Sequence, residues 1–330
     1  MSHAPFHILA IVQAGRLQYE AVLLAASLRA MDPTFPGRVI FAEPQPTGAW
    51  AGHDPRIDST EVLAVLDRLR VEVVPFEARA FGAAYPHGNK IEALSLLPRD
   101  APFLFLDTDT LITGPVSSLP IAAAAPTASM KREGTWPKIE LYGPGYTAIW
   151  RSLHDKFGLD FESSLDRTFP DEYWQRYLYF NAGWFCAPEA GPFADSFLEI
   201  ACAIRAAPPA ELVLQKLDPW LDQIALPLVV HKLGGGRPGP AFDGLDGALS
   251  CHWRVLSLLL ARESDRTVEI LYEVSGPNWI KRALKEYEPF KRMLYQRKGA
   301  RVRAMFDRNA LPRTEAKLRR RLKNAGLWLR

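Results

Sequence analysis

Residues 103–109, Phe-Leu-Phe-Leu-Asp-Thr-Asp, decide the fold. The four apolar residues are typical of a strand in a parallel sheet that is covered on both faces, because such strands lose the alternation of apolar and polar residues. Ligands of open α/β sheets bind beyond the carboxyl ends of the strands, where Asp107 and Asp109 follow. Two carboxylates this close repel each other unless a cation lies between them, and Mg²⁺ or Mn²⁺ takes oxygen ligands. The stretch predicts a divalent-cation site, and the alternative is a strand end followed by a solvated turn.

The first 110 residues alternate strand-like and helix-like patterns. Strands are predicted over residues 7–13, 38–42, 71–76 and 101–106, and helices over residues 17–31, 59–70 and 89–97. Successive strand–helix–strand units predict an α/β fold with a Rossmann-like, mostly parallel sheet flanked by helices. No Gly-x-Gly-x-x-Gly motif follows the first strand, which argues against a dinucleotide-binding unit.

The middle of the chain is less regular. Residues 113–175 mix Pro, Gly, Trp and Tyr, as in a loop-rich insertion. Residues 177–186 have a strand pattern that is interrupted at Asn181-Ala182-Gly183, and Gly inside a strand often marks a bulge or the close approach of a ligand. Helices are predicted over residues 192–206 and 218–232, and a loop over residues 234–247.

The bulk composition excludes several classes of protein. With 48% hydrophobic and 23% charged residues, the chain has the composition of an ordinary globular protein. No apolar run approaches 18 residues, and residues 1–9 lack the features of a secretory signal. The three cysteines are far apart and form no CxxC pair, which favours a reducing compartment. We therefore expect a cytoplasmic protein.

The charge is concentrated at one end of the sequence. Residues 281–330 carry 17 Lys or Arg and only 4 Asp or Glu, although the whole chain has a net charge of +3. The pattern predicts a basic helical tail over residues 286–330, with Leu318 and Leu322 on an apolar face. Such a helix is suited to an anionic membrane surface, which would place the protein peripherally at the inner membrane face. The alternatives are a helix packed on the body or a contact in a homodimer; no nucleic-acid partner is expected, because no recognised module surrounds the basic residues.

Four motifs in a familiar order define a family resemblance. They are Lys90 in Gly-Asn-Lys-Ile, the Asp-Thr-Asp of residues 107–109, the Phe-Asn-Ala-Gly of residues 180–183 and the Leu-Asp-Gln of residues 221–223. With them, residues 6–285 resemble GT-A-type glycosyltransferases, closest to the family-eight group that includes glycogenin and lipopolysaccharide sugar transferases. The resemblance implies a GT-A-like fold and metal-dependent transfer of a hexose from a nucleoside diphosphate sugar to a glycan or glycolipid acceptor.

The resemblance also implies a division of the chain and a role for each motif. Residues 1–112 would form the nucleotide-binding half and residues 113–285 the acceptor half of one domain. The implied donor-binding residues are Lys90, Asp107, Gly183 and Lys281, the last of these at the diphosphate. The backbone at Gln13 and Ala14 is expected to line the base pocket because it follows the first strand of the sheet. The implied residues around the reacting sugar are Asn181, Asp222 and Gln223.

One departure from the family pattern concerns the third metal ligand. The family supplies a late His ahead of a Gly-Pro pair, and here Glu273 stands in that position, before Gly276-Pro277. A carboxylate also ligates Mg²⁺ or Mn²⁺. We therefore expect Asp107, Asp109 and Glu273 as the ligands, with His252 as the alternative to Glu273.

Two other functions compete with this interpretation. The haloacid-dehalogenase-type phosphohydrolases also have two Asp residues one apart after an apolar strand. Their motif requires Thr or Val where this chain has Leu111, and it usually follows the first strand rather than the fourth. The second alternative is a non-catalytic nucleotide- or glycan-binding protein at a membrane surface. Hydrolysis of a donor in the presence of Mn²⁺ would separate an enzyme from such a binding protein.

Overall fold

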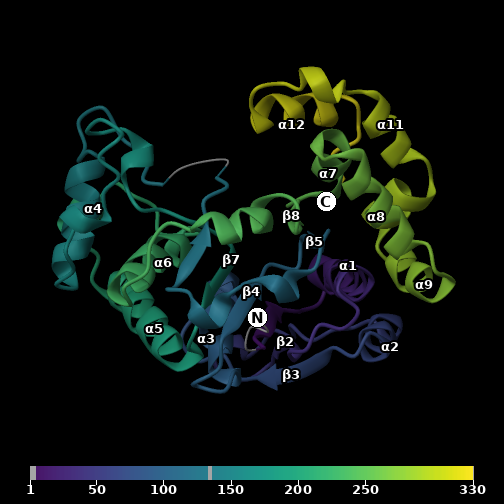
Figure 1. The fold of residues 1–330 in the computed structure, drawn as a ribbon, viewed down its shortest axis with the longest axis horizontal. Coiled ribbons are helices and arrows are strands. Elements are labelled where there is room, and N and C mark those ends of the chain that lie inside the picture. The colour runs from purple at the N-terminus through teal and green to yellow at the C-terminus, as the bar shows by residue number, and fades with distance from the viewer. Residues whose placement is uncertain (1–4, 133–135, 330) are drawn as a thin grey trace.

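A six-stranded mixed sheet forms the centre of the molecule, with strand order β3-β2-β1-β4-β7-β6 (Figure 1). A computed structural model describes residues 5–132 and 136–329. Strands β3, β2, β1 and β4 are parallel, whereas β7 is antiparallel to both β4 and β6. The strands, with a separate β5–β8 pair, are β1 His7–Ile11, β2 Val39–Pro44, β3 Glu72–Phe76, β4 Phe103–Leu106, β5 Thr110–Ile112, β6 Thr127–Ser129, β7 Asn181–Ala187 and β8 Ser250–His252.

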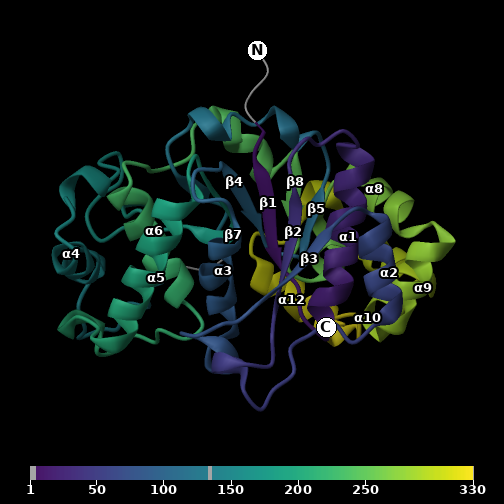
Figure 2. The same cartoon turned by 90° about the horizontal axis from the view of Figure 1, so that it is seen from below.

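Helices cover both faces of this sheet (Figure 2). The first six are α1 Arg16–Met31, α2 Thr60–Arg68, α3 Asn89–Glu92, α4 Tyr146–Lys156, α5 Ala190–Ala206 and α6 Leu221–Lys232. The remaining six are α7 Leu256–Arg262, α8 Asp265–Ser275, α9 Asn278–Glu286, α10 Glu288–Phe290, α11 Lys298–Ala304 and α12 Glu315–Asn324. The predicted α/β class is confirmed.

The central strands are apolar on both faces, so a buried apolar cluster forms on each side of the sheet. In β1, Ile8 and Ala10 belong to one buried cluster and Leu9 and Ile11 to another. Residues 103–106 of β4 divide between the same clusters in alternation, since successive side chains of a strand point to opposite faces. The apolar run is therefore a strand buried on both faces, as its composition predicts.

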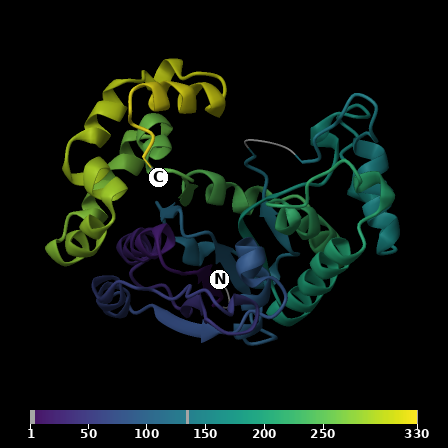
Figure 3. The same cartoon turned by 180° about the vertical axis from the view of Figure 1, so that it is seen from behind.

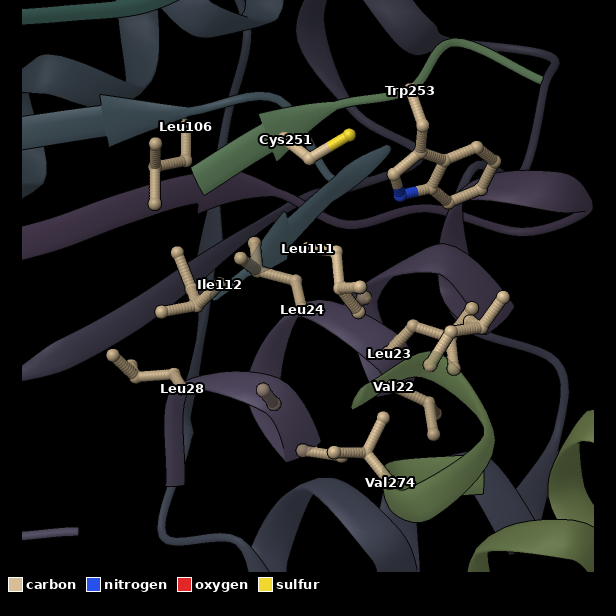
Figure 4. Packing of buried hydrophobic residues seen from close by; sticks show 14 of the residues in the cluster. Val22, Leu23, Leu24, Leu28, Leu106, Leu111, Ile112, Cys251, Trp253 and Val274 are labelled. Carbon is tan, nitrogen blue, oxygen red and sulfur yellow. The ribbon is translucent and has the colours of Figure 1, made fainter. Parts of the chain in front are cut away.

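The first cluster joins the N-terminal helices to the end of the chain. It contains residues of α1, α2, β5, β8 and α8, together with leucines of α12. Figure 4 shows part of it, with side chains from α1, β5, β8 and α8 packed together. The second cluster, on the other face, is built by α3, α5 and α6 and has an aromatic centre in which Phe105 stacks on Phe185 with ring centroids 4.6 Å apart.

The short β5–β8 pair determines where the site forms. Strand β5 starts one residue after Asp109, and its Thr110 is in register with His252 of β8. The Trp253 N–H donates to the Asp109 carbonyl oxygen at 2.9 Å, which extends the pairing by one step. A histidine far along the chain is thereby brought beside the two carboxylates.

Several predicted boundaries differ from those observed. The helix expected over residues 89–97 is α-helical only to Glu92 and continues as a 3₁₀ turn, Ala93–Leu96. Strand β7 begins at Asn181, where an interruption was expected, and its pairing with β6 carries a register shift at residues 128–129. The bulge expected from Gly183 is therefore present, and it lies at the start of the strand.

The basic tail is helical and packs on the body (Figures 1 and 3). Leu318 and Leu322 of α12 and Leu327 beyond it are almost fully buried in the first cluster. The apolar residues expected to face a membrane are thus part of the core, as in the alternative of a helix packed on the body. Within the described residues, none of the helices combines the length and hydropathy that crossing a bilayer requires. The predicted boundary at residue 285 separates segments that share one core.

Candidate active site

Three potential ligand side chains meet at the carboxyl end of β4. Asp107 and Asp109 follow the strand, and His252 ends β8. His252 Nε2 lies 3.1 Å from Asp109 Oδ1 and 3.9 Å from Asp107 Oδ2. One ligand atom from each of the three residues lies within 4.8 Å of the others, so this group has the composition and spacing of a divalent-cation site.

Glycine at position 183 makes room for the imidazole. A Cβ there would lie 2.2 Å from His252 Nδ1, closer than any side chain allows. The Gly183 carbonyl oxygen accepts a hydrogen bond of 2.9 Å from the Asp107 N–H, so strand β7 also fixes the first carboxylate. The sequence pattern indicated a bulge or the close approach of a ligand at this glycine, and the group that lies close to it is the His252 side chain.

Lys90 is a buried cation between two acidic residues. Its Nζ lies 2.9 Å from Asp107 Oδ1, 3.3 Å from Asp222 Oδ2 and 3.1 Å from the Ala182 carbonyl oxygen. Burial alone would lower the pKa of this ammonium, but the two carboxylates raise it well above its ordinary value. Lys90 therefore stays charged and ties the first carboxylate to helix α6.

Helix α6 carries two further predicted site residues, Asp222 and Gln223, near Lys90. The Tyr85 hydroxyl donates to Asp222 Oδ1 at 2.9 Å and accepts from the Asp222 N–H at 3.0 Å. The Tyr179 hydroxyl donates to Gln223 Oε1 at 2.9 Å, which leaves the amide nitrogen of Gln223 as the group that can face a ligand. Both side chains are therefore held in fixed orientations.

Both polar atoms of the Asn181 side chain form hydrogen bonds with backbone groups. Its Nδ2 donates to the Lys131 carbonyl oxygen at 3.0 Å, and its Oδ1 accepts from the Gly183 N–H at 3.0 Å. The side chain lines the cavity, but its two polar atoms shape the bulge that begins β7. The hydrogen bond from the Gly183 N–H to Asn181 Oδ1 holds Gly183 in place.

A second charged pair lies behind Asp109. Arg16 Nη1 lies 2.8 Å from Glu20 Oε1 and 3.9 Å from Asp109 Oδ2. Burial opposes ionisation of Asp109, but His252, Arg16 and Lys90 lower its pKa to about 2. Burial and the neighbouring Asp109 raise the pKa of Glu20 well above its ordinary value. Asp109 thus stays ionised although it is buried.

Two cavities meet at Asp107 and Asp109. The larger has a volume of about 290 Å³ and the smaller about 200 Å³. Both are lined by Arg16, His87, Lys90, Asp107 and Asp109, so they form one continuous cleft. The larger is also lined by polar and aromatic side chains from later in the chain: Arg132, Asn181, Trp220, Asp222, Gln223, His252, Arg254, Glu315, Arg319 and Trp328.

The remaining predicted residues lie at different distances from the cleft. Gln13 lines the smaller cavity, and its Oε1 accepts from Asn89 Nδ2 at 3.2 Å. The Ala14 N–H is used by the Pro55 carbonyl oxygen at 2.8 Å, and Ala14 lines neither cavity.

The structure does not bring Glu273 or Lys281 to the carboxylates. Glu273 is exposed on α8, with an oxygen 3.6 Å from Arg266 Nη1. Lys281 lies on α9, with its Nζ 5.2 Å from the ring centroid of Tyr295. Neither residue lines the cleft, because the Gly276-Pro277 pair falls between two surface helices instead of beside β4.

Several cleft residues were not anticipated from the sequence. Arg16 and Glu20 lie in the first turns of α1, the helix that follows β1. The sequence marks them only by their closeness to the carboxyl end of that strand. Arg132 has Nε and Nη1 buried without a hydrogen-bond partner among the described residues, and burial lowers its pKa to about 10. Arg254 lies beyond the predicted loop in a stretch to which no element was assigned, and Arg319 lies in the predicted basic tail, so no local pattern marked either as a cleft residue.

The fold and site together define an α/β protein with a cleft at the carboxyl end of a parallel strand, where Asp107, Asp109 and His252 could hold a metal ion. The family model described as the Rhodobacterales glycosyltransferase domain matches residues 8–234. The chain therefore belongs to this glycosyltransferase family, which confirms the predicted enzyme class and decides against a phosphohydrolase.

Several solved structures of glycosyltransferases are distantly similar to this chain. The chain is similar to the apo structure of the WbbM bifunctional glycosyltransferase (12% identity, TM-score 0.47), with 86% of this chain matching 52% of that one. It is similar to the galactosyltransferase LgtC in complex with donor and acceptor sugar analogues (13% identity, TM-score 0.46; 84% and 99% of the chains). It is also similar to the apo form of the glycosyltransferase GlyE of Streptococcus pneumoniae TIGR4 (11% identity, TM-score 0.44), with 86% of this chain matching 64% of that one. The chain thus spans about half the length of WbbM, and no curated protein matches it.

Proposed function

We propose that this glycosyltransferase moves a hexose from a nucleoside diphosphate sugar to a glycan or glycolipid acceptor, with Mn²⁺ or Mg²⁺ held by Asp107, Asp109 and His252. The observation that carries the proposal is the cluster of these three side chains in the cleft: Asp107 and Asp109 line both cavities, and His252 lines the larger one. Two carboxylates and one imidazole are a donor set that fits such a cation. When bound, the cation would supply positive charge to the diphosphate leaving group.

The two cavities suggest how the donor lies. The smaller one, between β1 and α1, includes Gln13 and follows the carboxyl end of the first strand, which is the usual place for a nucleotide in an α/β sheet. The larger one includes Asp222 and Gln223, whose oxygen and nitrogen atoms suit sugar hydroxyls. We assign the nucleotide to the smaller cavity and the reacting sugar with its acceptor to the larger.

The third ligand in this proposal is His252 and not Glu273. His252 is already within hydrogen-bonding distance of Asp109, whereas Glu273 is paired with Arg266 on an outer helix. In the same way, the charge expected from Lys281 is supplied near the carboxylates by Lys90 and Arg16. The proposed site therefore keeps a third metal ligand and a positive charge near the carboxylates, but different residues supply them.

A cytoplasmic enzyme at an anionic membrane surface is the proposed setting for a glycolipid acceptor. It draws support only from the exposed basic residues of α12, among them Arg320 and Lys323. Because the leucines of that helix are buried, such contact would be electrostatic and would weaken with salt.

Thermal unfolding with a panel of nucleotide sugars, each with and without Mn²⁺, tests the proposed function. A donor at one hundred times its dissociation constant stabilises the folded state by about 2.7 kcal/mol. We expect one donor to raise the midpoint only with Mn²⁺, and Asp109→Asn to abolish that shift. Asp195→Asn, which changes an exposed carboxylate paired with Arg99, is the matched control and should keep it. A donor-dependent, Mn²⁺-dependent shift that survives Asp109→Asn would refute the assignment of the site.

A further inference from the structure

The C-terminal helix forms part of the cleft wall. Glu315 and Arg319 of α12, and Trp328 just beyond it, line the larger cavity together with the metal-binding group. The family match ends at residue 234, so this segment lies outside the matched domain. A part of the chain that resembled an appended basic tail therefore faces the proposed donor.

One buried carboxylate organises the positive charge there. Glu315 Oε1 lies 2.8 Å from Arg319 Nη2, and Glu315 Oε2 lies 3.1 Å from Arg262 Nη1 and 3.7 Å from Arg254 Nη1. Glu315 is 8% exposed, so its charge is compensated by three guanidinium groups around it. Arg262 is also paired with Glu263, its Nε lying 2.9 Å from Glu263 Oε1, so the positive charge in excess at the cavity comes from Arg254 and Arg319 against Glu315. That excess suits an anionic ligand.

Arg254 connects this wall to the metal-binding group. It follows His252 by two residues and has a left-handed backbone conformation with φ of 61°, which is unfavourable for a residue with a Cβ. Its carbonyl oxygen accepts from Arg16 Nη1 at 3.0 Å, and Arg16 Nη1 also lies 3.9 Å from Asp109 Oδ2. Strained positions of this kind concentrate at functional sites. The conformation directs the guanidinium of Arg254 toward Glu315 and the cavity.

Apolar packing fixes the helix in this position. Leu318, Leu322 and Leu327 are at most 4% exposed in the cluster that also holds α1 and α7. Burial of an apolar side chain is favourable, so the three leucines together hold the segment against the body. Arg319 is on the same helix but is half exposed at the cavity, with its Cζ 5.3 Å from the Trp328 ring centroid.

We infer that Arg254 and Arg319 bind the diphosphate of the donor opposite the metal-binding group, so that the C-terminal helix is a working wall of the active site. This inference rests on the proposed function. Guanidinium groups present paired N–H donors that match phosphate oxygens. Phosphate is the shared chemistry of a donor diphosphate and a phosphorylated acceptor, and the structure favours the donor because Arg254 is only two residues from His252 in the chain.

Isothermal titration of the full chain in Mn²⁺ tests the inference, with UDP, GDP and inorganic pyrophosphate as the probes. We expect Arg319→Ala and Arg254→Ala to weaken the diphosphate that binds wild type by about tenfold to a hundredfold, as for loss of a hydrogen bond to a charged group. Arg320→Ala is the matched control, because it removes the same side chain from the next, exposed position of the same helix. It should change the affinity less than twofold, and circular dichroism should show that all variants are folded.

Three outcomes would overturn the inference. If Arg319→Ala and Arg254→Ala bind diphosphate like wild type while Asp109→Asn does not, the proposed function stands and this inference fails. If wild type binds none of the probes, both fail. If inorganic phosphate binds to protein already saturated with UDP and Mn²⁺, and only this binding is lost in Arg319→Ala, the wall serves a phosphorylated acceptor and the donor assignment is wrong.

Discussion

The imidazole of His252 fills the space that a side chain at Gly183 would need, since a Cβ there would lie 2.2 Å from Nδ1. Strand β7 and the β5–β8 pair are therefore matched in shape at this one point. The contact means that the position of His252 on β8 depends on a glycine at residue 183 of β7.

Gly183→Ala should displace the imidazole. The added methyl group meets a ring that is held 3.1 Å from Asp109, so the ring must move or the strand must shift. We expect about 1–3 kcal/mol of lost stability, typical of overpacking, and weaker Mn²⁺ binding. Urea unfolding and a Mn²⁺ titration measure the two effects.

Gly239→Ala is the control for this change, because nothing lies within 4 Å of a Cβ at that position. It should leave both quantities close to those of wild type. Full Mn²⁺ affinity in Gly183→Ala would show that His252 is not confined as described.

Lys90→Met should destabilise the fold. It leaves Asp222, whose side chain is 3% exposed, facing a methyl group in place of an ammonium 3.3 Å away. Removing one partner of a buried ion pair costs about 3–5 kcal/mol, and the free energy of unfolding in urea should fall by that order.

Lys281→Met is the comparison, since Lys281 contacts only the face of Tyr295 among the interactions described. Its loss should cost about 0.5–1 kcal/mol. Equal losses in the two variants would mean that Lys90 is not the buried cation that joins β4 to α6.

His154 should make the protein less stable in acid. The ring is almost fully buried, its Nε2 has no hydrogen-bond partner among the described residues, and burial lowers its pKa to about 4. Below pH 6.5 the unfolded chain takes up a proton that the folded chain refuses until about pH 4. The free energy of unfolding therefore falls as pH drops from 6.5 to 4, by about 3 kcal/mol in full.

His154→Phe should remove most of this fall, because the aromatic packing on Phe161 is kept and the titrating group is lost. His53→Phe, at an exposed position, should leave the fall in place. Urea unfolding at pH 7, 5.5 and 4 compares the slopes, and an unchanged slope in His154→Phe would contradict the assignment.

Local patterns predicted the N-terminal half well. Residues 103–106 are buried on both faces, and their composition alone requires that. The strand–helix order likewise follows from periodicity, and the position of Asp107 and Asp109 follows from the end of an apolar run. These features depend on neighbours in the sequence.

Features that depend on distant pairing were not predictable in the same way. His252 reaches Asp109 because β8 pairs with β5 over three residues, too few for a recognisable pattern. The family motif pointed to Glu273 because it was aligned on Gly276-Pro277, which here joins two surface helices. The amphipathic pattern of α12 was recognised, but an apolar face suits a membrane and a protein core equally.

The most direct test of the central claim is a titration of Mn²⁺ into wild type, His252→Ala and Glu273→Ala, followed by electron paramagnetic resonance of the free ion. Changes at residues that only orient metal ligands already cost about tenfold to a hundredfold in affinity, so loss of a ligand should cost at least that. We predict that His252→Ala weakens Mn²⁺ binding by at least about tenfold and that Glu273→Ala leaves it unchanged. Unchanged binding in His252→Ala with a loss in Glu273→Ala would contradict the account.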